Sequence, residues 1–408
     1  MSAPVRVARK RLDITPADLA RGLVGCLRPP SRPDAEARVA AAWTPADTVL
    51  SCLSARSGLA LLLAVVDWPP GSEVLVSALT IPHVTLLVRA HGYRPVAVDV
   101  DPGTLRLDPD AVARACTPRT RALVHAQLLG ASDDVAELAA LARARGLLLV
   151  EDRAQAYDGR DRELGPHADV ALYSFGTIKT LTCLGGGILL VRDPRLRARM
   201  AAHQRSWPVQ RSRSYAVKLV RGAAMLALGH PAVYPHFVRL ASALTGDYDA
   251  VVRRLSRGYG DANLLDQLRR QPCTPLLGLL AHRLAADDPA RVRRRARAGE
   301  LLAGALQPHV RQLGARASRR THWLFPVVAT DPDALVAAGR AAGFDLTRGS
   351  STLVALDPDC RQAAAAIATV VYLPAYAAMS DADLHRLAAV VNAVERDAAP
   401  PPTTPPRR

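Results

Sequence analysis

The chain has 408 residues and a formal net charge of +16, with 53 lysines and arginines against 37 acidic residues. Its hydrophobic share of 49% and charged share of 22% are those of a globular protein and exclude a largely disordered chain. A net positive charge of this size is consistent with binding to nucleic acid. However, aromatic residues make up only 4%, and the sequence shows no zinc-ligand spacing or helix-turn-helix pattern beside the arginines. Nucleic-acid binding is therefore not expected.

A chain of this length is expected to form two domains, one large and one small. We predict that residues 1–45 are an arm with one amphipathic helix, that 46–250 form the large domain and that 251–397 form a smaller C-terminal domain. Residues 398–408 are rich in proline and end in two arginines, so a disordered tail is expected there.

In the first half of the chain, short apolar runs alternate with helical stretches. The runs predict seven strands, at 48–52, 73–77, 94–98, 120–126, 147–151, 170–175 and 187–192. The stretches between them predict helices at 58–66, 82–91, 109–115 and 134–145. Continuous apolar strands between helices are typical of a mostly parallel sheet covered on both faces, which binds ligands at the carboxyl ends of its strands. The sequence therefore predicts an α/β fold.

The second half of the chain is mainly helical up to residue 287 and mixed after it. Helical stretches at 292–306, 332–342 and 381–394, with strand-like runs at 322–328 and 368–373, predict a small α+β domain. The uncharged stretch 222–238 holds two prolines and is too short to span a membrane. We expect a helical hairpin packed on the core there, and peripheral membrane contact stays open.

The cysteines are scattered along the chain, with no close pairs: Cys26, Cys52, Cys116, Cys183, Cys273 and Cys360. In a chain of this length such spacing indicates free thiols in a reducing compartment. The first residues lack the apolar core of a secretory signal. A cytoplasmic protein is expected.

Lysine is rare here, because only Lys10, Lys179 and Lys218 occur among the 53 basic residues. A primary amine can lose its proton when its pKa is lowered and then attack a carbonyl, whereas a guanidinium stays charged. Lys179 follows the strand-like run 170–175, where a site at the sheet edge would lie. It is either a surface lysine left by drift or a catalytic amine, and its neighbours favour the second interpretation.

Polar residues gather at the ends of two predicted strands near this lysine. Asp152 and Gln155 follow one buried run, and Ser174 ends the next. The glycine turn 185–187 comes after the lysine and lets backbone pass close to another group. Asp152 taken alone is also consistent with an acid that caps a turn.

A fourth feature is the start of the predicted helix at Ser57-Gly58. Free backbone N–H groups and the positive end of the helix dipole suit a phosphate there. Taken alone this signal is weak, because many helices begin with serine and glycine.

Together these features resemble the DegT-type (DegT/StrS) sugar aminotransferases, which use pyridoxal 5'-phosphate on the type I aminotransferase fold. The resemblance covers residues 48–200 well and 265–395 loosely. The blocks that carry it are Ser57-Gly58-Leu59-Ala60-Leu61, Pro70-Gly71-Ser72-Glu73-Val74, Gly92-Tyr93-Arg94-Pro95-Val96, Glu151-Asp152-Arg153-Ala154-Gln155, Ser174-Phe175 with Lys179, Gly185-Gly186-Gly187 and Tyr372-Leu373-Pro374.

The resemblance implies roles for three of the residues already singled out. Lys179 is expected to hold the cofactor covalently through its amine and to shuttle a proton between substrate and cofactor. Asp152 is expected to pair with the pyridine nitrogen and keep it protonated. Gln155 matches the family position that hydrogen-bonds the phenolic oxygen of the cofactor.

The resemblance also implies a phosphate cup and a stacking residue. Ser174, with the backbone N–H groups of Ser57 and Gly58, matches the cup. His83 lies near the position of a residue that stacks on the cofactor ring, although strict alignment puts Ile81 there. The chain departs from the family pattern at several flanking positions, among them Gly176 and Gln127, which bears on substrate identity more than on cofactor binding.

The function implied is a pyridoxal-phosphate-dependent aminotransferase, acting as a homodimer without metal. Glutamate is the expected amino donor and a keto sugar, carried by a nucleoside diphosphate, the expected acceptor. Arg348 is a candidate contact for an anionic substrate, or else a loop arginine in solvent. Two alternatives remain: an elimination or dehydration on a related sugar with the same cofactor, and a noncatalytic basic scaffold that keeps the fold.

Overall fold

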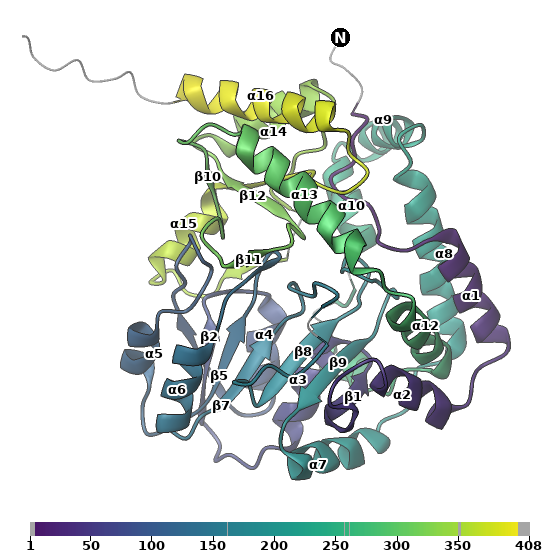
Figure 1. Cartoon of the computed structure of the whole chain (residues 1–408), viewed down its shortest axis with the longest axis vertical. Coiled ribbons are helices and arrows are strands. Elements are labelled where there is room, and N and C mark those ends of the chain that lie inside the picture. Colours follow the sequence, from purple (N-terminus) through teal and green to yellow (C-terminus); the bar gives the residue numbers. More distant parts are fainter. Residues whose placement is uncertain (1–4, 161, 257, 261, 350–351, 399–408) are drawn as a thin grey trace, which may run out of the picture.

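The computed structural model describes residues 5–160, 162–256, 258–260, 262–349 and 352–398 (Figure 1). The predicted tail lies outside these residues except for Ala398, which ends the last helix. The smaller part of the molecule, formed by the green and yellow C-terminal elements, lies above the large sheet in the view of Figure 1.

A seven-stranded sheet forms the centre of the larger part. Its strands are β1 Val49–Cys52, β2 Glu73–Ser77, β4 Arg94–Val98, β5 Thr120–Ala126, β7 Leu148–Asp152, β8 Val170–Ser174 and β9 Gly187–Val191. They lie in the order β1-β9-β8-β7-β5-β2-β4. The pairings from β4 through β8 are parallel, whereas β9 runs antiparallel to both of its neighbours. The predicted mostly parallel sheet is confirmed.

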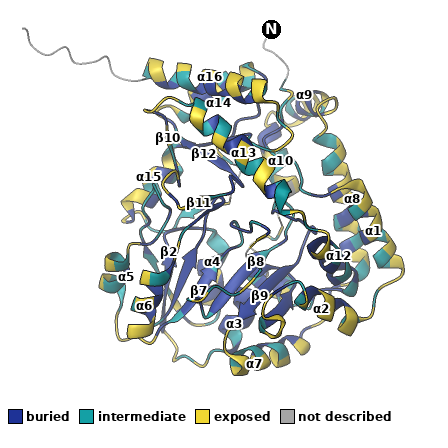
Figure 2. Cartoon of the chain, in the orientation of Figure 1, coloured by how far each residue is buried: buried dark blue, intermediate teal, exposed yellow. Residues whose placement is uncertain are grey.

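Apolar side chains cover both faces of this sheet because successive residues of a strand point to opposite sides. On β2, Leu75 packs with one core cluster and Val74 and Val76 pack with another. Apart from β4 at the edge of the sheet, the strands are buried along most of their length (Figure 2). The helices that flank them are α3 Ala55–Val65, α4 Pro82–Ala90, α5 Pro109–Ala115, α6 Ala136–Ala144 and α7 Pro194–Arg205.

A three-stranded antiparallel sheet forms the centre of the smaller part. Its strands are β10 Arg311–Gln312, β12 Phe325–Val328 and β14 Val370–Leu373. Its helices are α13 Pro289–Ala305, α14 Pro332–Ala341, α15 Arg361–Thr369 and α16 Asp381–Ala398. The predicted small α+β unit is therefore present, and helix α16 packs on both α13 and α14.

Short strand pairs join the two parts. β11 Arg319–Arg320 pairs with β6 Ala131–Ser132, and β13 Val354–Ala355 pairs with β3 Leu79–Thr80. In each pair one strand comes from the first half of the chain and the other from the second. Backbone hydrogen bonds therefore hold the small domain against the rim of the large one.

The N-terminal segment holds two helices, α1 Pro16–Leu27 and α2 Arg32–Ala40, so the prediction of a single helix was wrong. Pro29 and Pro30 interrupt the helical conformation between the two helices, and the side chain of Ser31 then caps the second helix. Helix α12 Thr274–Ala285 packs on both, and α11 Leu264–Leu268 packs on α3. The domain boundary at residue 250 stays a prediction, although these two later helices lie beside the large sheet.

The uncharged stretch around 222–238 lies in two helices, α8 Ser212–Leu228 and α9 Tyr234–Thr245, which are followed by α10 Tyr248–Ser256. Helix α8 packs on α1, whereas α9 packs with α10 and contributes to a separate small apolar cluster with Ala8. The two helices are thus held by different partners and do not form a hairpin on one core. No helix within the described ranges is long and apolar enough to cross a membrane.

Residues 7–13 form an extended segment, the N-terminal strap, that reaches the small domain. The backbone N–H of Asp345 donates to the carbonyl of Val7 at 2.9 Å. The guanidinium of Arg9 donates to both carboxylate oxygens of Asp345, at 2.7 and 2.9 Å, and Tyr248 donates to the same carboxylate at 2.8 Å. Asp345 has no exposed surface, so its charge is neutralised mainly by Arg9.

Replacing Arg9 with methionine should destabilise the protein by about 3–5 kcal/mol, because the carboxylate of Asp345 stays buried without its counter-charge. The measurement is urea unfolding followed by circular dichroism. The matched control is Arg6→Met, because the side chain of Arg6 is exposed, and it should change the free energy of unfolding by less than about 0.5 kcal/mol. Equal stability of the two variants would contradict this reading of the strap.

Candidate active site

Lys179 lies in the turn that follows β8, at the carboxyl edge of the parallel strands. Its backbone N–H donates to the carbonyl of Gly176 at 2.9 Å. Leu181 and Leu184, just beyond it, both have left-handed backbone conformations, with φ of 55° and 58°. A branched residue rarely adopts this conformation, and such strain is concentrated at functional sites. This defined turn geometry fixes the position of the Lys179 backbone and therefore the point from which its side chain extends.

The amine of Lys179 is in an environment that favours its neutral form. Burial lowers its pKa to about 7, while the charge of Asp152 opposes this effect and that of Arg56 adds to it. Its Nζ lies 4.1 Å from the centroid of the Trp323 ring. At neutral pH a large share of this amine is unprotonated and able to attack a carbonyl.

Asp152 is the last residue of β7 and pairs in register with Leu172 of the neighbouring parallel strand. One carboxylate oxygen accepts a hydrogen bond from the backbone N–H of Ala154 at 2.9 Å. Burial raises the pKa of Asp152, while the Ala154 N–H and the charge of Lys179 lower it. The structure therefore brings the predicted acid and the predicted lysine within electrostatic reach of one another.

Gln155 and Ser174 lie at the same edge of the sheet. Gln155 accepts a hydrogen bond from the backbone N–H of Leu129 at 3.0 Å, and its amide nitrogen has no partner in the part of the chain that the structure describes. That nitrogen is available to donate to a ligand. The hydroxyl of Ser174 accepts from the backbone N–H of Gly176 at 3.4 Å.

The start of α3 differs from the prediction. Ser54 caps this helix and accepts from the backbone N–H of Ser57 at 3.1 Å, and the Gly58 N–H bonds to the Ser54 carbonyl at 3.0 Å. The donors assigned to the phosphate cup are therefore already used. The backbone N–H groups without a partner among the described residues belong to Ala55 and Arg56.

Gly58 has a packing role instead. A Cβ at this position would lie 2.1 Å from Cδ1 of Leu189, so a larger residue would force the buried Leu189 side chain on β9 to shift. The sequence pattern was read one turn too late, because the capping serine at position 54 was not distinguished from the serine at position 57.

His83 lies near the beginning of α4, whose N-cap residue is Ile81. Its Nδ1 lies 3.1 Å from an Nη of Arg56. Arg56 in turn acts electrostatically on both Asp152 and Lys179. Arg56 was not predicted from the sequence, although a charged residue on the first turn of a helix at the binding edge of the sheet is a recognisable signal.

Two further residues of the site were missed. Nζ of Lys10, in the N-terminal strap, lies 3.8 Å from the centroid of the Trp323 ring, the same ring that Lys179 approaches. The indole N–H of Trp323 donates to the carbonyl of Ile178 at 2.9 Å, which fixes the ring beside the lysine turn. The rarity of lysine, which singled out Lys179, applied equally to Lys10 and could have indicated it.

Arg348 makes its contacts within the small domain. Its guanidinium donates to the carbonyl of Ala368 at 2.8 Å and lies 3.4 Å from the carboxylate of Asp333. Its side chain is 44% exposed. Nothing in these contacts brings it to Lys179, and its substrate role stays a prediction.

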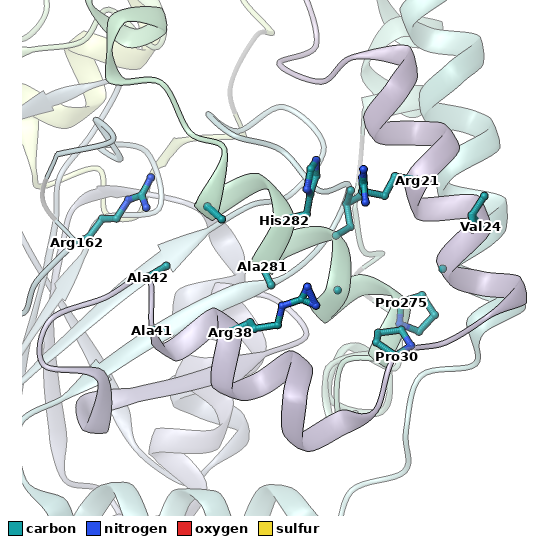
Figure 3. A pocket seen from close by; sticks show the side chains of 14 residues that line it. Arg21, Val24, Pro30, Arg38, Ala41, Ala42, Arg162, Pro275, Ala281 and His282 are labelled. Atoms are coloured by element: carbon teal, nitrogen blue, oxygen red, sulfur yellow. The ribbon is translucent and has the colours of Figure 1, made fainter.

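A cavity of about 740 Å³ lies elsewhere, where α1, α2 and α12 meet (Figure 3). Arg21, Arg38 and His282, one from each of these helices, contribute to its lining. Neither Lys179 nor Asp152 is among its lining residues. Cavity volume alone therefore does not identify the reactive site in this chain.

The donor set around Lys179 fits pyridoxal phosphate. A buried amine of lowered pKa suits its aldehyde, the carboxylate of Asp152 its ring nitrogen, and the free amide nitrogen of Gln155 its phenolic oxygen. The unpartnered N–H groups at the start of α3 suit its phosphate. The described residues hold no cluster of histidine, cysteine and acidic side chains that suits a metal ion.

Comparison with known proteins agrees with this fit. Residues 34–223 match the DegT/DnrJ/EryC1/StrS aminotransferase family, so the resemblance seen in the sequence is confirmed over this stretch. The L-glutamine:2-deoxy-scyllo-inosose aminotransferase of Micromonospora echinospora is 38% identical over 42% of this chain and 42% of its own length. The dTDP-3-amino-3,4,6-trideoxy-alpha-D-glucose transaminase of Streptomyces venezuelae is 39% identical over 39% of this chain and 43% of its own length. Each match spans less than half of the relative.

Among solved structures, the aminotransferase TlmJ from Streptoalloteichus hindustanus aligns with a TM-score of 0.70. The alignment covers 98% of this chain and 100% of that one, at 23% identity. A likeness at this identity concerns the fold, and it confirms the predicted type I aminotransferase fold over almost the whole chain.

Proposed function

We propose that this protein is a pyridoxal-phosphate-dependent aminotransferase that moves an amino group from glutamate to the keto carbon of a sugar. The observation that carries the proposal is the buried amine of Lys179, with a pKa lowered to about 7, beside the carboxylate of Asp152. The names of the two curated relatives, both aminotransferases, support this reaction class.

Each residue of the site has a defined task in this proposal. Lys179 would hold the cofactor covalently through its amine and would carry a proton between the substrate carbon and the cofactor. The carboxylate of Asp152 would accept a hydrogen bond from the ring nitrogen and so keep that nitrogen protonated. When bound, the cofactor supplies an electron sink for the substrate carbanion. Gln155 orients the ring by donating to its phenolic oxygen.

A nucleoside diphosphate is the proposed carrier of the acceptor sugar. The net charge of +16 makes the protein attractive to a polyanion, and the arginines offer bidentate contacts to phosphate. The dTDP-linked name of the Streptomyces venezuelae relative is consistent with such an acceptor.

The test is a pair of half-reactions followed by absorbance of the cofactor. Glutamate, with glutamine as the comparison donor, should convert the enzyme to its aminated form, and one member of a panel of keto-sugar nucleotides should restore the starting spectrum. Ping-pong kinetics should follow. A turnover that releases a dehydrated sugar without consuming an amino donor would instead establish elimination, and a protein that never binds the cofactor would establish a noncatalytic scaffold.

The homodimer is part of the same proposal. Apolar side chains that a partner could cover include Leu27 on α1 and Leu244 on α9, which are 82% and 75% exposed. Sedimentation at micromolar concentration should give a dimer, and a monomer throughout would contradict this part of the proposal.

A further inference from the structure

A small cavity lies beside Lys179, on the side of the N-terminal strap. It has a volume of about 170 Å³ and is lined by strap residues, by the turn 178–180, by α13 and by the segment 373–378. Lys10, Lys179 and Arg295 all contribute to its lining. Two of these three cationic side chains keep donor nitrogens without a hydrogen-bond partner in the described part of the chain.

Lys10 is the first of them. Its Nζ is buried and rests on the Trp323 ring at 3.8 Å, and it has no hydrogen-bond acceptor among the described residues. Burial lowers the pKa of Lys10 well below its usual value, and the neighbouring charge of Lys179 lowers it further. Its N–H donors rest on the face of a ring, which does not satisfy them as a conventional acceptor would. A nearby anion favours the protonated form of such an amine and accepts from it.

Arg295 is the second. Its Nε donates to the carbonyl of Thr321 at 2.8 Å and one Nη to the hydroxyl of Thr180 at 3.0 Å. The other Nη is buried without a partner in the described ranges. Burial lowers the pKa of Arg295 to about 10, so the guanidinium stays charged at neutral pH.

The one acidic side chain in the cavity lining does not supply the missing acceptor. Asp13 forms an ion pair with Arg291 and accepts from the backbone N–H of Leu181 at 2.8 Å. The lining therefore offers donors without a partner beside the reactive amine, and an anionic oxygen can accept from them.

We propose that this cavity binds the carboxylate of the amino donor, with Lys10 and Arg295 as the donors to its two oxygens. The volume of about 170 Å³ is below the roughly 300–1,000 Å³ of pockets that enclose whole ligands, so the cavity takes one small anionic group and not a nucleotide. A carboxylate bound here lies next to Lys179, where the donor amine must arrive. The assignment rests on the proposed function in naming an amino donor, whereas carboxylate binding itself does not depend on that function.

The experiment is calorimetric titration of the purified protein with glutarate, a dicarboxylate that has no amine and cannot react. The wild-type protein should bind it. Lys10→Met removes one charged donor and should weaken binding by about tenfold or more. Lys10→Arg keeps a charged donor and should remain within about threefold of wild type.

The matched control is Lys218→Met, because Lys218 approaches Tyr259 and does not line the cavity. It should bind glutarate as the wild type does. No uptake of glutarate by the wild type, or equal affinity in Lys10→Met, would overturn the assignment. Inorganic phosphate is titrated in parallel, and phosphate binding that is tighter than glutarate binding and lost in Lys10→Met would identify a phosphate site instead.

A second readout separates this inference from the proposed function. Each preparation is reduced with borohydride, and the mass of the peptide that contains Lys179 is measured by mass spectrometry. Glutarate binding without cofactor mass on that peptide would contradict the proposed function alone. Cofactor mass with no effect of Lys10→Met on glutarate binding would contradict the carboxylate subsite alone.

Discussion

Lys179→Ala should abolish amino transfer, lowering the rate by at least about 10⁴-fold, because the variant loses both the covalent attachment of the cofactor and the group that moves the proton. Borohydride reduction followed by mass spectrometry should find the cofactor mass on the Lys179 peptide of the wild type and on no peptide of the variant. Lys218→Ala is the matched control and should keep both the label and the activity. A label that persists in Lys179→Ala would remove the assignment.

The same residue makes a prediction about pH. The neutral amine is the reactive form, so cofactor binding to the cofactor-free protein should accelerate as pH rises through about 7, and not through the ordinary lysine value of 10.5. The charged groups acting on it are Asp152, which favours the protonated form, and Arg56, which opposes it. Stopped-flow absorbance measures this rate, and a midpoint near 10 would show that the amine is not buried in solution.

Asp152→Asn should reduce amino transfer on the order of 10²–10⁴-fold while leaving Lys179 able to bind the cofactor. An amide cannot hold the proton of the ring nitrogen as a carboxylate does, so the electron sink is weakened and the attachment is not. The measurement is the single-turnover rate with glutamate, together with the borohydride label.

Asp67→Asn is the control for this substitution, because Asp67 is 86% exposed and pairs with Arg199 at the surface. It should retain full activity. Loss of the Lys179 label in Asp152→Asn would show that the acid supports cofactor attachment itself. Undiminished turnover would show that Asp152 has no part in the chemistry.

The central sheet could be predicted from sequence because all of its strands except the edge strand β4 are largely buried and appear as short apolar runs. β2, β4 and β5 begin and end where those runs do. Asp152 was singled out for a related reason, since a polar residue directly after such a run lies at the binding edge of a parallel sheet, and Lys179 comes shortly after the next run. Their catalytic roles stay predictions.

What the sequence could not provide are the contacts between distant segments. Lys10 reads as part of a basic N-terminal stretch, and Trp323 as part of a strand, until the fold places both beside Lys179. The start of α3 was predicted one turn too late, because Ser54 and Ser57 are equally plausible caps and only the hydrogen bonds distinguish them. The phosphate cup itself stays a prediction. The second N-terminal helix was missed because two prolines obscured the cap at Ser31.

The N-terminal strap has a consequence for how the protein is made. Arg9 and Asp345 are 336 positions apart, so their ion pair cannot form until most of the chain has been synthesised. At roughly 5–20 residues per second, ribosomal elongation takes about 17–67 s to cover that distance. Until then the strap has no partner in the small domain, and Lys10 has no Trp323 ring to rest on. Nascent chains released early should therefore contain the large sheet but lack the contacts of Lys10 and Trp323 that complete the site around Lys179.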